Sequence, residues 1–376
     1  MKKTIILSVS ALILALTSVA RADISLSGYA EYYAGSADQS IANGTTNHGI
    51  DQSGMSNGTF TRITGSASTT LDSGIEVNIT STMYSEDCQG NQAGNCGVVN
   101  FNNAAFSTNF GTVTVGETFD VGAGGYSRMT ASGPGADPDA GAMTHFYTAD
   151  AKANYGAANE TNYADNSMKI KYNSNVYSGF SVAVGFTPHM GEEGGNTTQQ
   201  DVAANTLSGN NWDNGFTDVL HVLGRYTMDM DGVGLTAAVG QITGNAGQIG
   251  GRNYNDLDEL VYSVHVSFAG FAADYRKNEA DNSGREAATN AGNNEGTSMC
   301  GEYRMANLGL GVCQVETGFT DANNRSNSST IRTYAAEYSL GGGANLAVVY
   351  FTDEHEANSV TNTDVDGVMT KLSIGF

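Results

Sequence analysis

The sequence predicts an all-β protein, a single up-and-down barrel of sixteen antiparallel strands that spans a membrane. Three observations lead to this prediction. Segments that alternate apolar and polar residues recur from residue 23 to the end of the chain. Tight turns and long polar links alternate between these segments. The chain also ends on a strand that continues to the carboxyl terminus itself, as a barrel needs in order to close its seam.

The last strand shows the alternation most clearly. Val368, Leu372, Ile374 and Phe376 share one face, and Met369, Lys371, Ser373 and Gly375 share the other. An apolar row on one side and a small or charged row on the other is typical of a strand between lipid and a watery interior.

The first 22 residues have the pattern of a cleaved secretory signal. Lys2 and Lys3 give a positive start, residues 5–16 form an apolar stretch too short to span a bilayer, and Ala20 and Ala22 flank a small-residue cleavage site. We therefore expect residues 1–22 to be removed and residues 23–376 to form the barrel domain beyond the inner membrane.

Composition and charge narrow the class of protein. The chain carries a net charge of −22, and removal of the signal, which contains three bases and no acid, takes it to −25. Such acidity excludes nucleic acid as an expected partner. The chain has 48 glycines and only 3 prolines, with 18 tyrosines and 14 phenylalanines, which suits many strands. No later apolar run approaches the roughly 20 residues of a transmembrane helix, so a membrane location requires a closed barrel.

Sixteen strands are predicted in chain order, and an even number is what single-chain bacterial barrels require. The first eight are Ile24 to Ala34, Thr59 to Thr70, Ile75 to Tyr84, Asn103 to Thr108, Thr112 to Thr118, Ser167 to Asn173, Phe180 to Thr187 and Val219 to Met228. The second eight are Gly234 to Ile242, Glu259 to Phe268, Phe271 to Arg276, Ser298 to Met305, Gly309 to Thr317, Thr330 to Leu340, Ala344 to Thr352 and Gly367 to Phe376.

Seven short connections join these strands in pairs. They fall at residues 72–74, 109–111, 175–179, 229–233, 269–270, 306–307 and 341–343, mostly at Asn, Asp and Gly, which supply the backbone angles of hairpin turns. The eight links between them are long and polar. This rhythm predicts both termini and all short turns at the periplasmic end, and the long links outside.

Three stretches carry a resemblance to a known family. They are residues 23–32 (Asp-Ile-Ser-Leu-Ser-Gly-Tyr-Ala-Glu-Tyr), residues 103–117 and residues 166–186. They resemble the general diffusion porins of alphaproteobacteria, of the Rhodobacter type, and by strand count the resemblance covers residues 23–376. It implies a trimeric, water-filled outer-membrane channel for small hydrophilic solutes and ions, surrounded by lipid and lipopolysaccharide, with its third external loop folded inward as a constriction. Glu117 departs from the family, which usually has Arg there, and so predicts a weaker cationic side of the constriction.

The expected constriction loop is residues 119–165, the longest link in the chain. Its position after the fifth strand favours the inward fold over an exposed flap. The candidate acids on it are Asp120, Asp137, Asp139 and Asp150.

Basic residues are expected on the wall that faces this loop. Strand alternation places Arg62, Lys169, Lys171, Arg276 and Arg304 away from lipid, where charge near the bilayer midplane would cost about 2–4 kcal/mol. Opposite charges across an aperture would set a transverse field, although each base could equally sit solvated in the lumen. The acidic charge predicts a preference for cations.

Four cysteines suggest two disulfides in the oxidising compartment. Cys300 and Cys313 are each six residues from the 306–307 turn, so the hairpin register sets them opposite each other, and it also pairs Glu302 with Gly311 and Tyr303 with Leu310. Cys88 and Cys96 are expected to close the second external link.

No metal-ligand motif of fixed spacing is present, so any metal site stays unknown. Acid clusters at 192–193, 256–259 and 353–356 are expected in external links, where their carboxylates could hold Ca²⁺ or simply be solvated. No cofactor is required.

Enzyme function is not expected. Residues 54–58 fit a Gly-x-Ser-x-Gly pattern but lack the strand-to-helix context of a catalytic serine. A general diffusion channel is the leading hypothesis, and a solute-specific channel with a binding track, an outer-membrane barrel enzyme and a secreted β-rich binding protein are the alternatives. The last conflicts with strands whose inward rows are read as Ser, Thr, Gly and charge.

Overall fold

The computed structural model describes residues 23–42, 54–86, 99–122, 125–126, 167–189, 216–246, 248–249, 252–253, 255–280, 294–320, 326–357 and 361–376. Within these residues, no helix has the length and apolar character needed to cross a membrane.

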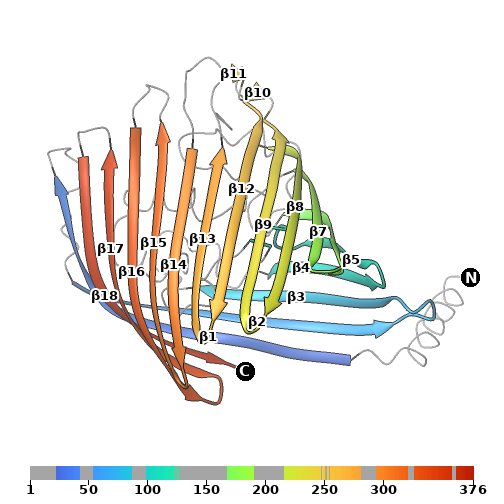
Figure 1. Ribbon diagram of the computed structural model, residues 1–376, viewed down its shortest axis with the longest axis horizontal. Coiled ribbons are helices and arrows are strands. Elements are labelled where there is room, and N and C mark those ends of the chain that lie inside the picture. The colour runs from blue at the N-terminus through green and yellow to red at the C-terminus, as the bar shows by residue number, and fades with distance from the viewer. Residues whose placement is uncertain are drawn as a thin grey trace, which may run out of the picture.

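Sixteen antiparallel strands form one closed barrel, as the sequence predicts, and Figure 1 shows them following one another around a continuous wall. The first eight are β1 (Asp23–Ala42), β2 (Gly54–Thr70), β3 (Glu76–Glu86), β4 (Val99–Thr108), β5 (Gly111–Glu117), β6 (Met168–Ser174), β7 (Phe180–His189) and β8 (Thr217–Met230). The remaining wall strands are β9 (Val233–Asn245), β12 (Leu257–Phe268), β13 (Phe271–Ala280), β14 (Asn294–Met305), β15 (Leu308–Thr320), β16 (Ser326–Gly341), β17 (Ala344–Ala357) and β18 (Thr361–Gly375).

The first and last strands close the barrel. β1 pairs with β18, and the backbone N–H groups of Gly28 and Phe376 each donate to the other residue's carbonyl at 2.9 Å. A Cβ on Gly28 would lie 2.4 Å from the Arg62 carbonyl oxygen and 2.8 Å from the Phe376 ring. Inside the seam, the Lys371 ammonium group lies 3.4 Å from the Glu31 carboxylate. The C-terminal strand therefore completes the wall, as its alternation predicts.

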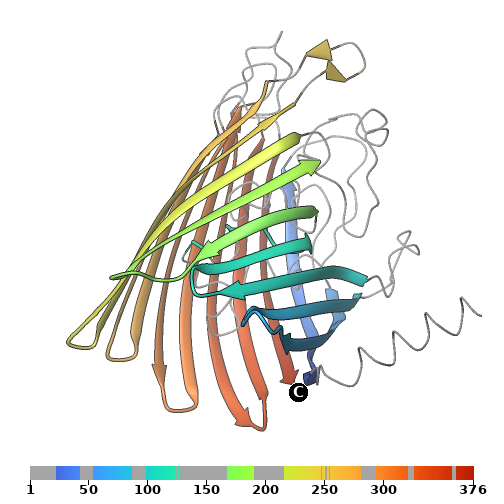
Figure 2. The same ribbon diagram turned by 90° about the vertical axis from the view of Figure 1, so that its right-hand side faces the viewer.

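The short turns lie at one end of the barrel, as Figure 2 shows. At Ser178–Gly179, Asp231–Gly232 and Ala269–Gly270, both residues of the turn have positive φ, which matches the twist of the flanking strands. Several strands extend beyond the predicted bounds at the opposite end. β2, for example, begins at Gly54 where Thr59 was expected, because the hydrogen-bond ladder continues after the apolar alternation stops. A small hairpin of β10 (Gln248–Ile249) and β11 (Arg252–Asn253) lies at this end and was not predicted.

The two faces of the wall differ in exposure. On β15, Leu310 and Val312 are 45 % and 46 % exposed, whereas Cys313 and Val315 on the other face are 3 % and 1 % exposed. The exposed row belongs to the outer, lipid-facing surface of the barrel. Alternation thus assigns an inward or outward direction to each described wall residue.

Part of the inner face is apolar, contrary to the expectation of inward Ser, Thr, Gly and charge. A buried cluster follows the inner rows of β15–β18 and β1, and it consists of Tyr33, Ala37, Cys313, Val315, Ile331, Ala335, Val349, Phe351, Val365 and Met369. Along this arc both faces of the sheet are apolar, so polarity alone could not distinguish the inner row.

Candidate functional site

The link that follows β5 begins inside the barrel. Lys169 on β6 is 2 % exposed and donates from Nζ to the carbonyl oxygens of Ser167, at 2.8 Å, and of Thr118. Lys171, two residues further along the same inner row, donates to the Phe119 carbonyl at 3.0 Å. Two ammonium groups of the wall therefore hold the first residues of the link by their backbone.

Arg62 holds the same segment from the other side. Its guanidinium carbon lies 5.9 Å from the centre of the Phe119 ring and 5.7 Å from that of Phe101, and the two rings are themselves 4.4 Å apart. Distances of this size allow cation–π attraction. Arg62 faces inward, as the sequence predicts, against the root of the link.

A chain of hydrogen bonds ties the next residues to β8. His221 is 1 % exposed, its Nδ1 lies 2.5 Å from Asp120 Oδ2, and its Nε2 lies 2.8 Å from the Tyr126 hydroxyl. The Val121 N–H also donates to Asp120 Oδ1 at 2.7 Å. One imidazole therefore connects two residues of the link that are six positions apart.

Asp120 stays ionised although its carboxylate is buried. Asp120 lies in the link, outside the spanning strands. Burial alone would raise the pKa of its carboxyl, but His221, Lys169 and the Val121 N–H together outweigh burial and hold that pKa below its usual value. The carboxylate is thus the stable form of this residue.

Tyr126 packs between charged wall residues. The guanidinium carbon of Arg276 on β13 lies 5.4 Å from the centre of its ring, and the His221 ring stacks at 5.8 Å between centres. Burial raises the pKa of the Tyr126 hydroxyl, and the neighbouring Glu259 carboxylate on β12 raises it further. Tyr126 therefore stays protonated and can donate to His221.

Two wall glycines make room for the link. A Cβ on Gly185, which is paired with His221 across β7 and β8, would lie 2.9 Å from Asp120 Oδ1 and 3.3 Å from Val121 Cγ1. A Cβ on Gly240 of β9 would lie 2.1 Å from the Tyr126 hydroxyl oxygen. The inner wall is therefore shaped to accept these side chains.

Arg304 has a different setting from the other predicted bases. It lies near the 306–307 turn, with its guanidinium 3.4 Å from Glu302 and 3.5 Å from Glu337. The structure thus places Arg304 at the short-turn end of the channel. Arg276, on the neighbouring strand β13, pairs with Ser298 and so lies further from that end. Asp137, Asp139, Asp150, Cys88 and Cys96 lie outside the described residues.

Register and alternation place Glu117 on the outer face of β5. Glu117 continues the row of Val113 and Val115, which are 38 % and 39 % exposed, and it pairs with the outward Met168. The preceding residue, Gly116, pairs with Lys169 and faces the channel. Glu117 therefore belongs to the outer row of β5. Resemblance fixed the position along the chain but not the face of the strand.

Most residues of two acid clusters expected in external links belong to strands instead. Asp258 and Glu259 are in β12, and Asp353, Glu354 and Glu356 are in β17. Alternation separates the side chains of Asp353 and Glu354, so Asp353 is buried and accepts from Ser329 at 3.0 Å, while the outward Glu354 accepts from Arg332 at 2.8 Å. Among the described residues, no group of three acids, histidines or cysteines could hold a metal ion. Residues 192–193 fall outside the described ranges.

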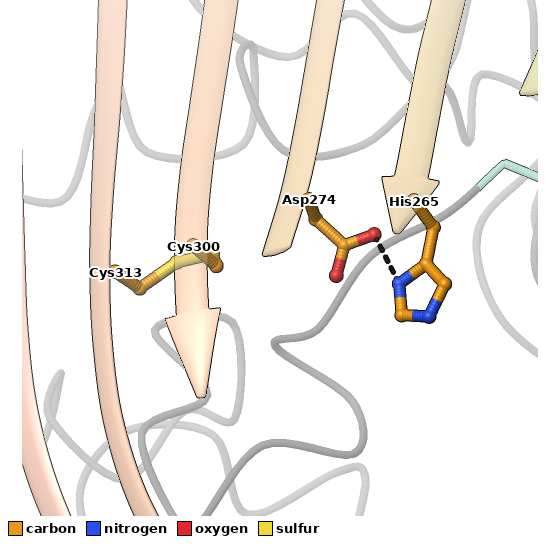
Figure 3. The surroundings of a disulfide bond; sticks show 4 residues. All are labelled: His265, Asp274, Cys300 and Cys313. Carbon is orange, nitrogen blue, oxygen red and sulfur yellow. Dashed lines mark hydrogen bonds and ion pairs between the residues drawn. A yellow bond between two sulfur atoms is a disulfide. The ribbon is translucent and has the colours of Figure 1, made fainter. Parts of the chain in front are cut away.

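Cys300 and Cys313 form a disulfide across β14 and β15 (Figure 3). Their pairing, and those of Glu302 with Gly311 and Tyr303 with Leu310, follow the predicted register. Next to the disulfide on the inner face, Asp274 lies between the cysteines and His265, whose Nδ1 is 3.0 Å from Asp274 Oδ1.

His221, Tyr126 and Glu259 were not predicted as site residues. Alternation along β8 could have placed His221 on the inner row between Val219 and Leu223. Its partners are about one hundred residues away in the chain, and no sequence spacing indicates such a contact.

A closed sixteen-stranded barrel with an apolar outer surface and a chain segment held inside defines a channel protein of the outer membrane. The family model of Gram-negative porins matches residues 8–358, so the chain belongs to the Gram-negative porin family. The sequence resemblance to porins is therefore confirmed.

Solved structures support the same fold. The anion-selective porin from Comamonas acidovorans is similar, with a TM-score of 0.62, 13% identity and coverage of 95% of this chain and 100% of that one. A mutant of the Rh. blastica porin has a TM-score of 0.52, 17% identity and coverage of 94% and 100%. OmpT of Vibrio cholerae, in trimer form, has a TM-score of 0.58, 12% identity and coverage of 94% and 99%. A comparison with curated proteins gives no significant match.

Proposed function

We propose that this porin is a general diffusion channel for small hydrophilic solutes, that it prefers cations, and that residues 119–165 form its constriction. The observation that carries the proposal is the attachment of Thr118, Phe119, Asp120 and Tyr126 to the inner wall through Lys169, Lys171 and His221. A link whose first residues are held inside the barrel supports an inward course for the rest.

The contacts of the inward-facing basic residues support cation preference. Lys169 and Lys171 donate to backbone carbonyls, Lys371 lies beside Glu31, and Arg304 lies between two glutamates. Their charge is therefore partly offset by protein oxygen atoms. The chain as a whole carries −22, and Asp137, Asp139 and Asp150 belong to the proposed constriction. The resulting negative potential draws cations in and repels anions.

We further propose that residues 1–22 are a cleaved signal and that the mature chain forms a homotrimer. The outer rows of β1, β3 and β5 are aliphatic where they are most exposed, as at Ile24, Leu26 and Ile79. Elsewhere the outer surface carries paired aromatic rings such as Phe271 and Tyr303, whose centres are 4.3 Å apart. Aliphatic rows suit contact with another subunit, and aromatic rows suit the lipid interface, which lipopolysaccharide and phospholipid would occupy.

A solute-specific channel is the alternative, and an enzyme is not proposed. The test is single-channel conductance in a planar bilayer, with and without sugars. A general channel conducts in proportion to salt concentration and shows no saturable block by sugar. Block at low sugar concentration would support the solute-specific channel, and the absence of any conductance would contradict both.

A further inference from the structure

We propose that His221 is a positioning residue that clamps Asp120 and Tyr126 to the inner wall, and that Gly185 is the seat for this clamp. The role of this clamp in the cell rests on the proposed channel function. The contacts that hold the segment inside the barrel do not depend on that function.

The first step is the chemistry of the imidazole. Asp120 can only accept while it is ionised, so His221 Nδ1 must donate to it, across 2.5 Å. Nε2 lies 2.8 Å from the Tyr126 hydroxyl, with which it shares a second hydrogen bond. One imidazole thus ties Asp120 to Tyr126, and all three side chains are at most 3 % exposed. Loss of one partner leaves a buried polar atom without its hydrogen bond, which is costly in a low-dielectric interior.

The second step is the set of groups that surround the clamp. Lys169 on β6 contributes positive charge near Asp120, while Glu259 on β12 and Arg276 on β13 lie around Tyr126. β7 and β9 present Gly185 and Gly240 to the segment. The carboxylate that lies within hydrogen-bonding distance of Nδ1 is that of Asp120.

The third step is the shape of the wall. The three atoms nearest to a Cβ built on Gly185 belong to Asp120 and Val121, whereas a Cβ on Gly240 would also lie 2.8 Å from the Val222 carbonyl oxygen. We therefore expect Gly185→Ala to disturb the segment before it disturbs the wall. Gly224, on β8, offers the matched control, because its nearest atom would be 3.9 Å away.

The experiment is site-specific proteolysis of the folded porin in detergent micelles. Trypsin can cut after Arg128, two residues past Tyr126, and the new amino terminus at Met129 is quantified by mass spectrometry. We expect slow cutting in the wild type and in Gly224→Ala. We expect faster cutting in Gly185→Ala and in His221→Leu, by about tenfold or more, because cleavage follows the population of the released segment. Tenfold corresponds to about 1.4 kcal/mol.

Two further variants separate positioning from a general packing effect. Gln has both a donor and an acceptor, so His221→Gln should restore part of the protection that His221→Leu loses. Tyr126→Phe removes only the hydroxyl, and trypsin should cut this variant faster than Tyr172→Phe. The control Tyr172→Phe removes an exposed hydroxyl that donates to the Phe110 carbonyl. Barrel formation is checked for each variant by its heat-dependent gel mobility.

Equal cutting rates in all folded variants would overturn the clamp, and so would rapid cutting of the wild type. If Gly185→Ala fails to fold, the Tyr126→Phe comparison decides the question alone. If the wild type resists trypsin but shows no bilayer conductance, the proposed channel function is contradicted and the clamp is still supported.

Discussion

Lys169 faces the channel and yet is 2 % exposed, because its ammonium group donates to the backbone of Thr118 and Ser167. Alternation along β6 correctly predicts that this charge avoids lipid. It does not predict that the charge holds the first residues of the link after β5, since the acceptors are carbonyl oxygens and carry no sequence signal.

Lys169→Met tests this role. The two carbonyls lose a buried charged donor, so we expect the free energy of unfolding to fall by about 1.5–3 kcal/mol. Lys277→Met, which removes an outward ammonium group 2.5 Å from Glu279, should change it by less than about 1 kcal/mol. Urea unfolding in micelles, followed by tryptophan fluorescence, measures both. A stable Lys169→Met variant with a large change in ion selectivity would instead show a charge that lines the aperture.

Asp120 gives a prediction for pH. Its pKa in the folded protein lies below the ordinary value of 3.8, so ionised Asp120 stabilises the fold above that value, and the contribution is lost only as pH falls through the depressed pKa. The stability difference between the wild type and Asp120→Asn should therefore be constant from pH 7 to pH 5 and shrink below pH 3.8. A difference that already shrinks between pH 7 and pH 5 would contradict this assignment.

At the scale of elements, the strands, turns and hairpin registers follow from local rules. Period-two alternation and the Asn, Asp and Gly turns predict all sixteen wall strands, and equal spacing from the 306–307 turn predicts the pairing of Cys300 with Cys313. The strand ends and the β10–β11 hairpin were missed. Strands that pair outside the lipid need no apolar outer row, so they leave no alternation in the sequence. The contacts of His221 with Asp120 and Tyr126 were also missed, because they join residues that are far apart in the chain.

The cross-strand disulfide should be present in the purified porin. We expect one peptide pair joined through Cys300 and Cys313 in the unreduced protein, detected by mass spectrometry after digestion. Replacing both cysteines by serine should lower the free energy of unfolding by at most about 3 kcal/mol, the value for a loop of roughly fifteen residues. Channel conductance should stay unchanged. Free thiols at both positions would refute the pairing.

At the scale of the whole molecule, the aliphatic outer rows of β1, β3 and β5 predict assembly. The detergent-corrected mass from light scattering should equal three chains of the mature protein. Leu26→Arg, at a side chain that is 71 % exposed in the single chain, should shift the mass toward one chain, because a charge would be buried in the contact. Val312→Arg, on the outer face of β15 and separated from β1 by β16, β17 and β18, is the control. A single-chain mass for the wild type would contradict the trimer.

The most direct test of the whole account is the zero-current potential of the wild-type channel across a salt gradient. We predict the sign of a cation-preferring channel, and a preference that weakens as salt approaches 1 M, where the Debye length is about 3 Å. Replacing Asp120, Asp137, Asp139 and Asp150 together by Asn should reduce it further, and removing residues 131–142 should raise the conductance. Anion preference in the wild type, or unchanged conductance in a folded deletion variant, would contradict the account.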